Sequence, residues 1–161
     1  MGLPAAQAHH LRKVTVDAAH VVCVENPTAF YELIRHASLG SLAALCLWGN
    51  PSPACRHLLR RLADDLPEGV RLYAWADIDF GGLNILAQLR EQVSPRFEPY
   101  RMDVATLEAH TLWARPLTSG DVRNLTRLAR RPALRDMWPL IEALLRRDLK
   151  LEQEAIILAG N

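Results

Sequence analysis

The stretch VRLYAWADIDFGG, residues 70–82, decides the fold. Its first seven residues, 70–76, form a short and mostly apolar run, which is typical of a strand buried on both faces. Two acids, Asp77 and Asp79, follow this run, and the pair Gly81-Gly82 follows them. Leucines then recur at helical spacing. The stretch therefore predicts a buried strand that passes directly into a helix.

Two more apolar runs precede this stretch, and a less hydrophobic run follows it. They cover residues 20–24, 43–48 and 97–102. Segments with apolar residues at helical spacing separate the runs. Asn26-Pro27 and Ser52 mark two helix starts, because these residue types are favoured at the N-cap and the first helical position. This alternation predicts an α/β fold with a mainly parallel four-stranded sheet flanked by helices.

The pattern becomes helical after Asp103. Helices are predicted at residues 104–110 and 119–130, and one or two more from 134 to about 159, with Pro139 near a start or a kink. Residues 1–19 give only a weak helical signal, and we treat them as an N-terminal extension or a linker remnant. The expected domain therefore covers residues 20–161 and has a helical C-terminal part.

The composition allows one domain with an ordinary core. The chain has 161 residues, enough to bury a core without disulfides. Its formal net charge of +1 excludes a global basic field, so nucleic-acid binding would depend on local patches. The three cysteines lack metal-binding spacing, and their odd number favours a reducing compartment. No leader is present, and no apolar run approaches the roughly 20 residues that span a bilayer. We therefore expect a cytoplasmic protein without membrane contact.

Three acids follow predicted strands: Glu25 follows residues 20–24, and Asp77 and Asp79 follow residues 70–76. Ligands of open parallel sheets bind beyond the carboxyl ends of the strands, so we expect these acids at one edge. Clustered carboxylates repel one another, and Mg²⁺, which prefers oxygen ligands, relieves that repulsion. In the alternative, structural reading, the aspartates cap the next helix and Glu25 is a solvated loop acid.

Four short motifs occur in the order found in the DUF2399 family, and the chain resembles that family. They are VENP at 24–27, WGNPS at 48–52, ADIDFGG at 76–82 and LEQE at 151–154. The family comprises the Toprim-like (Rossmann-like) C-terminal domain of the nuclease of the Wadjet system, and is related to the A subunit of topoisomerase VI. The resemblance covers nearly the whole chain.

The resemblance implies a role for each acid. Glu25 would help to move protons at a scissile phosphate and would also touch a metal. Asp77 and Asp79 would hold Mg²⁺, for which Mn²⁺ can substitute, and charge on the phosphoryl oxygens would thereby be neutralised. Glu154 would be a further ligand or a partner of the ligands; its alternative is an acid on the surface of a helix.

The turn between the second run and its helix is a candidate anion site. Backbone amides at a helix N-terminus bind anions, and Asn50, Ser52 and Arg56 are the candidate phosphate or DNA contacts there. The alternative is a simple turn in which Ser52 caps the helix.

The expected function is Mg²⁺-dependent cleavage of DNA by the C-terminal part of a larger bacterial plasmid- or phage-defence protein. In topoisomerase-like relatives a separate winged-helix domain supplies the attacking tyrosine, so this chain is expected to use water or a partner. The expected partners are DNA and an N-terminal DNA-binding domain or subunits outside this chain; a homodimer is compatible. One alternative is a non-catalytic scaffold that binds nucleic acid or protein. Another is an α/β phosphatase or nucleotide-binding domain.

Overall fold

The computed structural model describes residues 13–36 and 42–158 and contains a four-stranded sheet. Its strands are β1 (His20–Val24), β2 (Leu42–Cys46), β3 (Arg71–Trp75) and β4 (Phe97–Pro99). All three strand pairings are parallel, and the spatial order is β2-β1-β3-β4. The predicted α/β class with a parallel four-stranded sheet is confirmed, although β4 is shorter than the run that predicted it.

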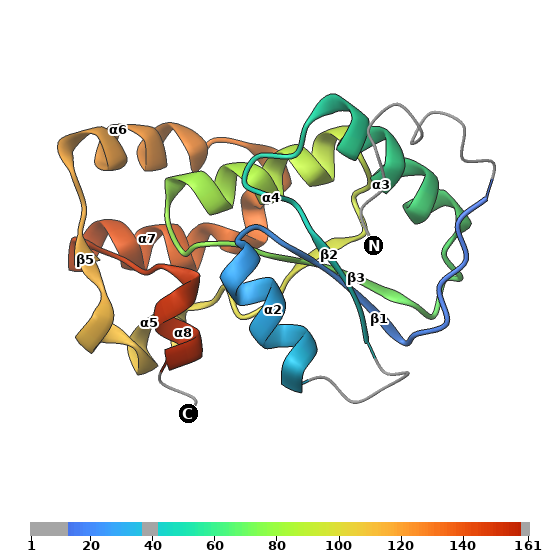
Figure 1. The fold of residues 1–161 in the computed structure, drawn as a ribbon. Coiled ribbons are helices and arrows are strands. Elements are labelled where there is room, and N and C mark those ends of the chain that lie inside the picture. The colour runs from blue at the N-terminus through green and yellow to red at the C-terminus, as the bar shows by residue number, and fades with distance from the viewer. Residues whose placement is uncertain (1–12, 37–41, 159–161) are drawn as a thin grey trace.

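Three helices connect the strands: α2 (Pro27–His36), α3 (Pro53–Asp65) and α4 (Phe80–Gln92). The chain crosses the sheet in one direction from β1 to β2, and in the other from β2 to β3 and β4. Right-handed crossovers in opposite directions place their helices on opposite faces, so α2 covers one face while α3 and α4 cover the other (Figure 1). This arrangement matches a Rossmann-like Toprim fold. The direction reverses between β1 and β3, and such switch points are where open sheets bind ligands.

The core lies between the sheet and these helices. Strand β1 has a neighbour on each side, and its residues 21–24 are fully buried. The leucines predicted to face the core from α4 (Leu83, Leu86 and Leu89) are also fully buried. Burial of each such leucine contributes roughly 1.5–3 kcal/mol, so α4 is fixed firmly against the sheet.

The C-terminal part adds helices and a second, two-stranded sheet. Its elements are α5 (Val104–Ala109), the 3₁₀ helix η1 (Thr111–Trp113), β5 (Arg115–Pro116), α6 (Ser119–Leu128), the 3₁₀ helix η2 (Pro132–Met137), α7 (Trp138–Arg147), β6 (Leu149–Lys150) and α8 (Gln153–Leu158). Strands β5 and β6 pair antiparallel.

The prediction of helices alone after Asp103 was wrong at this small sheet. Helix α7 ends at Arg147, and its C-cap Asp148 has a left-handed backbone (φ 55°) that turns the chain into β6 and so separates α7 from α8. Strands of two residues are too short to show an alternating pattern in the sequence. Pro139 lies in the first turn of α7, which agrees with its predicted place near a helix start.

Part of the predicted N-terminal extension lies on the domain. Residues 13–19 have no regular secondary structure, yet Val14 and Val16 pack against the core. The backbone N–H of Val14 also donates a hydrogen bond to Asp65 at the end of α3, over 2.8 Å. Residues 1–12 lie outside the described part. Among the described residues, no helix is both long and apolar enough to cross a membrane.

Candidate metal centre

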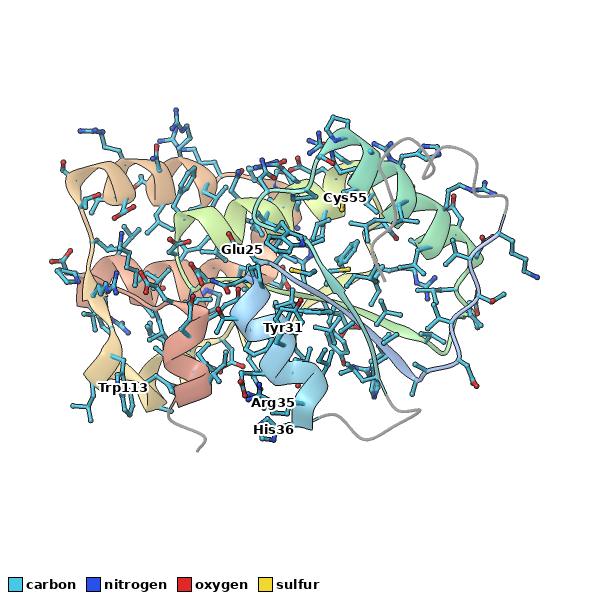
Figure 2. The ribbon with its side chains drawn as sticks, viewed as in Figure 1. Glu25, Tyr31, Arg35, His36, Cys55 and Trp113 are labelled. Carbon is cyan, nitrogen blue, oxygen red and sulfur yellow. The ribbon has the colours of Figure 1, made fainter. Side chains whose placement is uncertain are left out.

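Glu25 and Asp77 lie together at the switch point of the sheet. Glu25 follows β1 and Asp77 follows β3, which are adjacent parallel strands. The backbone N–H of Glu25 donates to the carbonyl oxygen of Trp75 over 2.9 Å, and the backbone N–H of Asp77 donates to Glu25 Oε2 over 3.2 Å. Figure 2 shows Glu25 where β1 passes into α2, and α8 packs beside that helix. The fold therefore places both acids at one edge.

Asp79 lies at the start of α4 and caps it. Its Oδ1 accepts a hydrogen bond from the backbone N–H of Gly82 over 2.9 Å. The turn is tight: a Cβ atom on Gly82 would lie 2.0 Å from the carbonyl oxygen of Asp77. Glycine is thus required where α4 begins, because any side chain would collide with the backbone that carries Asp77. The capping alternative holds for Asp79 but not for Asp77.

Asp77 instead binds the start of α8. The antiparallel bridge between Ile78 and Leu151 brings the two segments together. Asp77 Oδ1 then accepts a hydrogen bond from the backbone N–H of Gln153, the first residue of α8, over 2.8 Å. A residue close to the C-terminal end of the chain therefore orients the carboxylate that follows β3.

Asn26 links the same edge to α8 from the other side. Its backbone N–H donates to Oε1 of the fully buried Gln153 over 3.1 Å. Its side-chain Nδ2 donates to Glu154 Oε1 over 2.5 Å. Glu154 is partly buried rather than a free surface acid, and it lies beside the loop that follows β1. We call the four carboxylates Glu25, Asp77, Asp79 and Glu154 the acidic rim.

The pKa values report crowded negative charge on the acidic rim. Burial raises the pKa of Asp77 to about 7; the hydrogen bond from Gln153 opposes this shift, and repulsion from the other three carboxylates adds to it. Burial likewise raises the pKa of Glu25, where the hydrogen bond from Asp77 opposes the shift and the charges of Asp79 and Glu154 add to it. The four groups are therefore close enough to repel one another.

The donor chemistry of the acidic rim fits a hard divalent cation. Within residues 13–36 and 42–158, none of its carboxylates forms an ion pair with lysine, arginine or histidine. Carboxylates without cysteine or histidine suit Mg²⁺ better than Zn²⁺. In this same part of the chain, no three His, Cys, Asp or Glu side chains already form a metal-holding group. Mg²⁺ keeps several waters, so direct contact with one or two carboxylates is sufficient for binding.

The loop after β2 approaches the acidic rim through its backbone. The N–H of Gly49 donates to the carbonyl oxygen of Glu25 over 3.0 Å. Asn50 is exposed in this loop. Ser52 caps α3 by accepting from the N–H of Cys55 over 3.2 Å, and the guanidinium of Arg56 donates to the Pro51 carbonyl oxygen. Ser52 and Arg56 thus both stabilise the turn before α3, and Ser52 caps that helix as the alternative, structural reading predicted.

Three residues near the acidic rim were not assigned to the site from the sequence. Gln153 lies inside the LEQE motif, so its position was visible although its role was not. Trp48 follows β2 and Arg101 follows β4, and both have left-handed backbones (φ 58° and 53°). The Arg101 guanidinium lies 5.6 Å from the ring centroids of Trp75 and Tyr100. No local pattern indicates that arrangement, because Trp75 comes from β3 and Tyr100 from the turn after β4.

Comparisons with known proteins agree with the resemblance seen in the motifs. The family model described as "Wadjet protein JetD, C-terminal" matches residues 3–159 of this chain. The Wadjet protein JetD of Bacillus cereus (strain Q1) is 26% identical over 151 residues, which cover 91% of this chain and 36% of that relative. The chain thus spans little more than a third of the length of this relative.

Proposed function

This chain belongs to the family of Wadjet protein JetD C-terminal domains, and we propose that it is the Mg²⁺-dependent DNA-cleaving domain of a larger bacterial defence protein that acts against plasmids or phages. The observation that carries the proposal is the acidic rim at the switch point, whose carboxylates repel one another and have no cationic partner among the described residues.

The residues that would hold Mg²⁺, or Mn²⁺ in its place, are Asp77 and Asp79, with Glu25 and Glu154 beside them. Bound metal would supply Lewis-acid stabilisation of the charge that develops on phosphoryl oxygens. The hydrogen bonds from Gln153 to Asp77 and from Gly82 to Asp79 each occupy one carboxylate oxygen. They fix the orientation of both groups and leave the second oxygen to bind a ligand.

Glu25 is suited to accept the proton of an attacking water. Its raised pKa brings it nearer to neutral pH, where a general base is most effective. In the hydrolysis, a bond forms between the water oxygen and phosphorus, one ester oxygen–phosphorus bond breaks, and a proton of the water passes to Glu25. The leaving ester oxygen keeps the bonding electron pair and takes a proton from the solvent. Tyr73 and Tyr100 suit packing roles, because their rings contact edge to face with centroids 5.6 Å apart. Tyr31 lies on α2 (Figure 2), is largely exposed, and contacts the ring of Phe30.

DNA phosphates would meet Arg101 on the β4 side of the acidic rim and other polar side chains on the β2 side. Arg101 has no carboxylate partner among the described residues and is held over two aromatic rings, which prepares its guanidinium for a phosphate. Asn50 and Arg56 lie on the side of β2 and add further contacts. Some other described arginines are paired with acids, as Arg115 is with Glu152 and Arg131 with Glu91. With a formal net charge of +1, phosphate binding would depend on such local positions.

A non-catalytic scaffold that binds nucleic acid or protein is the second candidate. One observation favours it: among the described residues, no three side chains already converge as metal ligands. In this reading the acidic rim no longer supports turnover.

Nicking of supercoiled plasmid separates the two candidates. The wild-type chain, the variant Asp77→Asn and the control Glu98→Gln are each incubated with Mg²⁺ or Mn²⁺. Glu98 is a suitable control because its exposed carboxylate pairs with Arg71 at the opposite end of β3. We expect nicking by the wild type and the control, and none by Asp77→Asn or in the presence of EDTA. Intact plasmid in every reaction would favour the scaffold.

A further inference from the structure

Trp48 has an unusual environment for a tryptophan. Its side chain is 74% exposed, although it is large and mostly apolar. Its backbone is left-handed (φ 58°), a conformation that bulky residues rarely adopt, and Gly49 continues the turn at φ 87°. Backbone strain of this kind persists where surrounding structure enforces it, and it is concentrated at ligand sites.

Hydrogen bonds on both sides fix this loop to the end of β1. The N–H of Leu47 donates to the carbonyl oxygen of Val24 over 2.7 Å, and the N–H of Gly49 donates to the carbonyl oxygen of Glu25 over 3.0 Å. Trp48 lies between the two donors. The backbone of Trp48 is therefore held beside the end of β1 and Glu25, and its ring is exposed there.

We propose that Trp48 stacks on a nucleobase of the nucleic acid that binds the acidic rim. Aromatic side chains can stack on any base. Proteins that bind single-stranded nucleic acid typically combine such aromatic side chains with contacts to the phosphate backbone. Neighbouring strands are about 4.8 Å apart, so the ends of β2 and β3 lie about 10 Å from each other along the edge. One strand can thus place a phosphate at Asp77 and an unstacked base on Trp48.

The surroundings of Trp48 favour a base over a protein partner. The loop around it is polar, with Asn50 and Ser52 both exposed. A tryptophan that anchors a protein partner is usually surrounded by other residues that exclude water. In this loop, by contrast, Trp48 is the exposed large apolar side chain among polar neighbours. The proposal rests on the proposed nucleic-acid function of the acidic rim, but it concerns binding and needs no cleavage.

The test is binding of a short fluorescein-labelled single-stranded DNA, measured by anisotropy in the presence of Ca²⁺, a hard cation that takes oxygen ligands. A second DNA of equal length carries abasic sites throughout. We expect the wild type to bind the normal DNA about fivefold or more tightly than the abasic DNA. Trp48→Ala should lose this difference, while Trp48→Phe should keep most of it. Trp138→Ala, which removes another exposed tryptophan, from α7, is the matched control and should behave as the wild type.

Trp48→Gly guards against a folding artefact, because glycine adopts φ 58° without strain. This variant should melt no lower than the wild type and should show the same loss as Trp48→Ala. Equal binding of normal and abasic DNA by the wild type would overturn the proposal, and so would wild-type binding by both Trp48→Ala and Trp48→Gly. Since the readout is binding and not cleavage, failure of plasmid nicking refutes the proposed activity and leaves this result unaffected.

Discussion

The carboxylate of Asp77 accepts a hydrogen bond from the backbone N–H of Gln153, which is 76 residues away in the sequence and 2.8 Å away in space. Because Gln153 begins α8, Asp77 has two roles. It holds the last described helix against the sheet. Its other carboxylate oxygen is left to bind a ligand at the acidic rim. A substitution at Asp77 therefore affects the fold as well as the site, and the two effects can be separated.

Asp77→Asn should separate the two roles. The asparagine carbonyl can still accept from Gln153, while its neutral side chain removes the repulsion within the acidic rim. We expect the metal-free Asn variant to be as stable as the wild type or more stable. Asp77→Ala loses the cap and should lower the free energy of unfolding by about 1 kcal/mol. Urea denaturation in EDTA measures the free energy of unfolding of both variants. Equal destabilisation by Asp77→Asn and Asp77→Ala would contradict the two separate roles of Asp77.

The stability of the metal-free protein should depend on pH through Asp77. Its pKa is raised to about 7 in the folded state, against an ordinary value of about 4 in the unfolded chain. Between these values the folded state holds a proton that the unfolded state has lost. The contribution of this proton to the free energy of unfolding is therefore fully present below about pH 4, and it is lost as the pH rises through about 7. The raised pKa of Glu25 acts in the same direction.

We expect the melting temperature in EDTA to fall between pH 5 and pH 7.5, and Mg²⁺ to restore it at the higher pH. Asp77→Asn should show a smaller fall. Identical pH profiles for the wild type and Asp77→Asn would exclude Asp77 as the source of the dependence.

Gly82→Ala should be strongly destabilising. Its Cβ would lie 2.0 Å from the carbonyl oxygen of Asp77 and 2.8 Å from the Asp77 nitrogen, so backbone must move. We expect a loss of about 2 kcal/mol or more in the free energy of unfolding. Gly69→Ala is the control, since a Cβ there meets nothing within 4 Å. If both variants unfold at the same urea concentration as the wild type, the close approach of α4 to Asp77 is not required for stability.

Arg101→Ala should weaken DNA binding through lost charge. If its guanidinium contacts one phosphate, the slope of log affinity against log salt should fall by about 1. Arg71→Ala is the matched control, because Arg71 is exposed at the opposite end of β3 and pairs with Glu98 over 3.2 Å. An unchanged slope for Arg101→Ala, or an equal fall for Arg71→Ala, would remove Arg101 from the binding surface.

Local sequence patterns were sufficient to predict the sheet but not the whole site. The apolar runs and helix starts define the four strands, and the place of Glu25 and Asp77 at one edge follows from parallel pairing. The contact of Asp77 with Gln153 depends on how the C-terminal part returns to the sheet, through a bridge between single residues. The exposure of Trp48, the place of Arg101 over two rings and the left-handed backbones of both residues are not revealed by the sequence at non-glycine positions.

Binding of Mn²⁺, followed by the loss of its free EPR signal, tests the central claim most directly. The comparison is between the wild type, the control Glu98→Gln and the double variant Asp77→Asn/Asp79→Asn. Both asparagines keep an acceptor for Gln153 and Gly82, so the fold should persist. The account predicts that the wild type and the control bind Mn²⁺ and that the double variant does not. Binding by the double variant with wild-type affinity would contradict it.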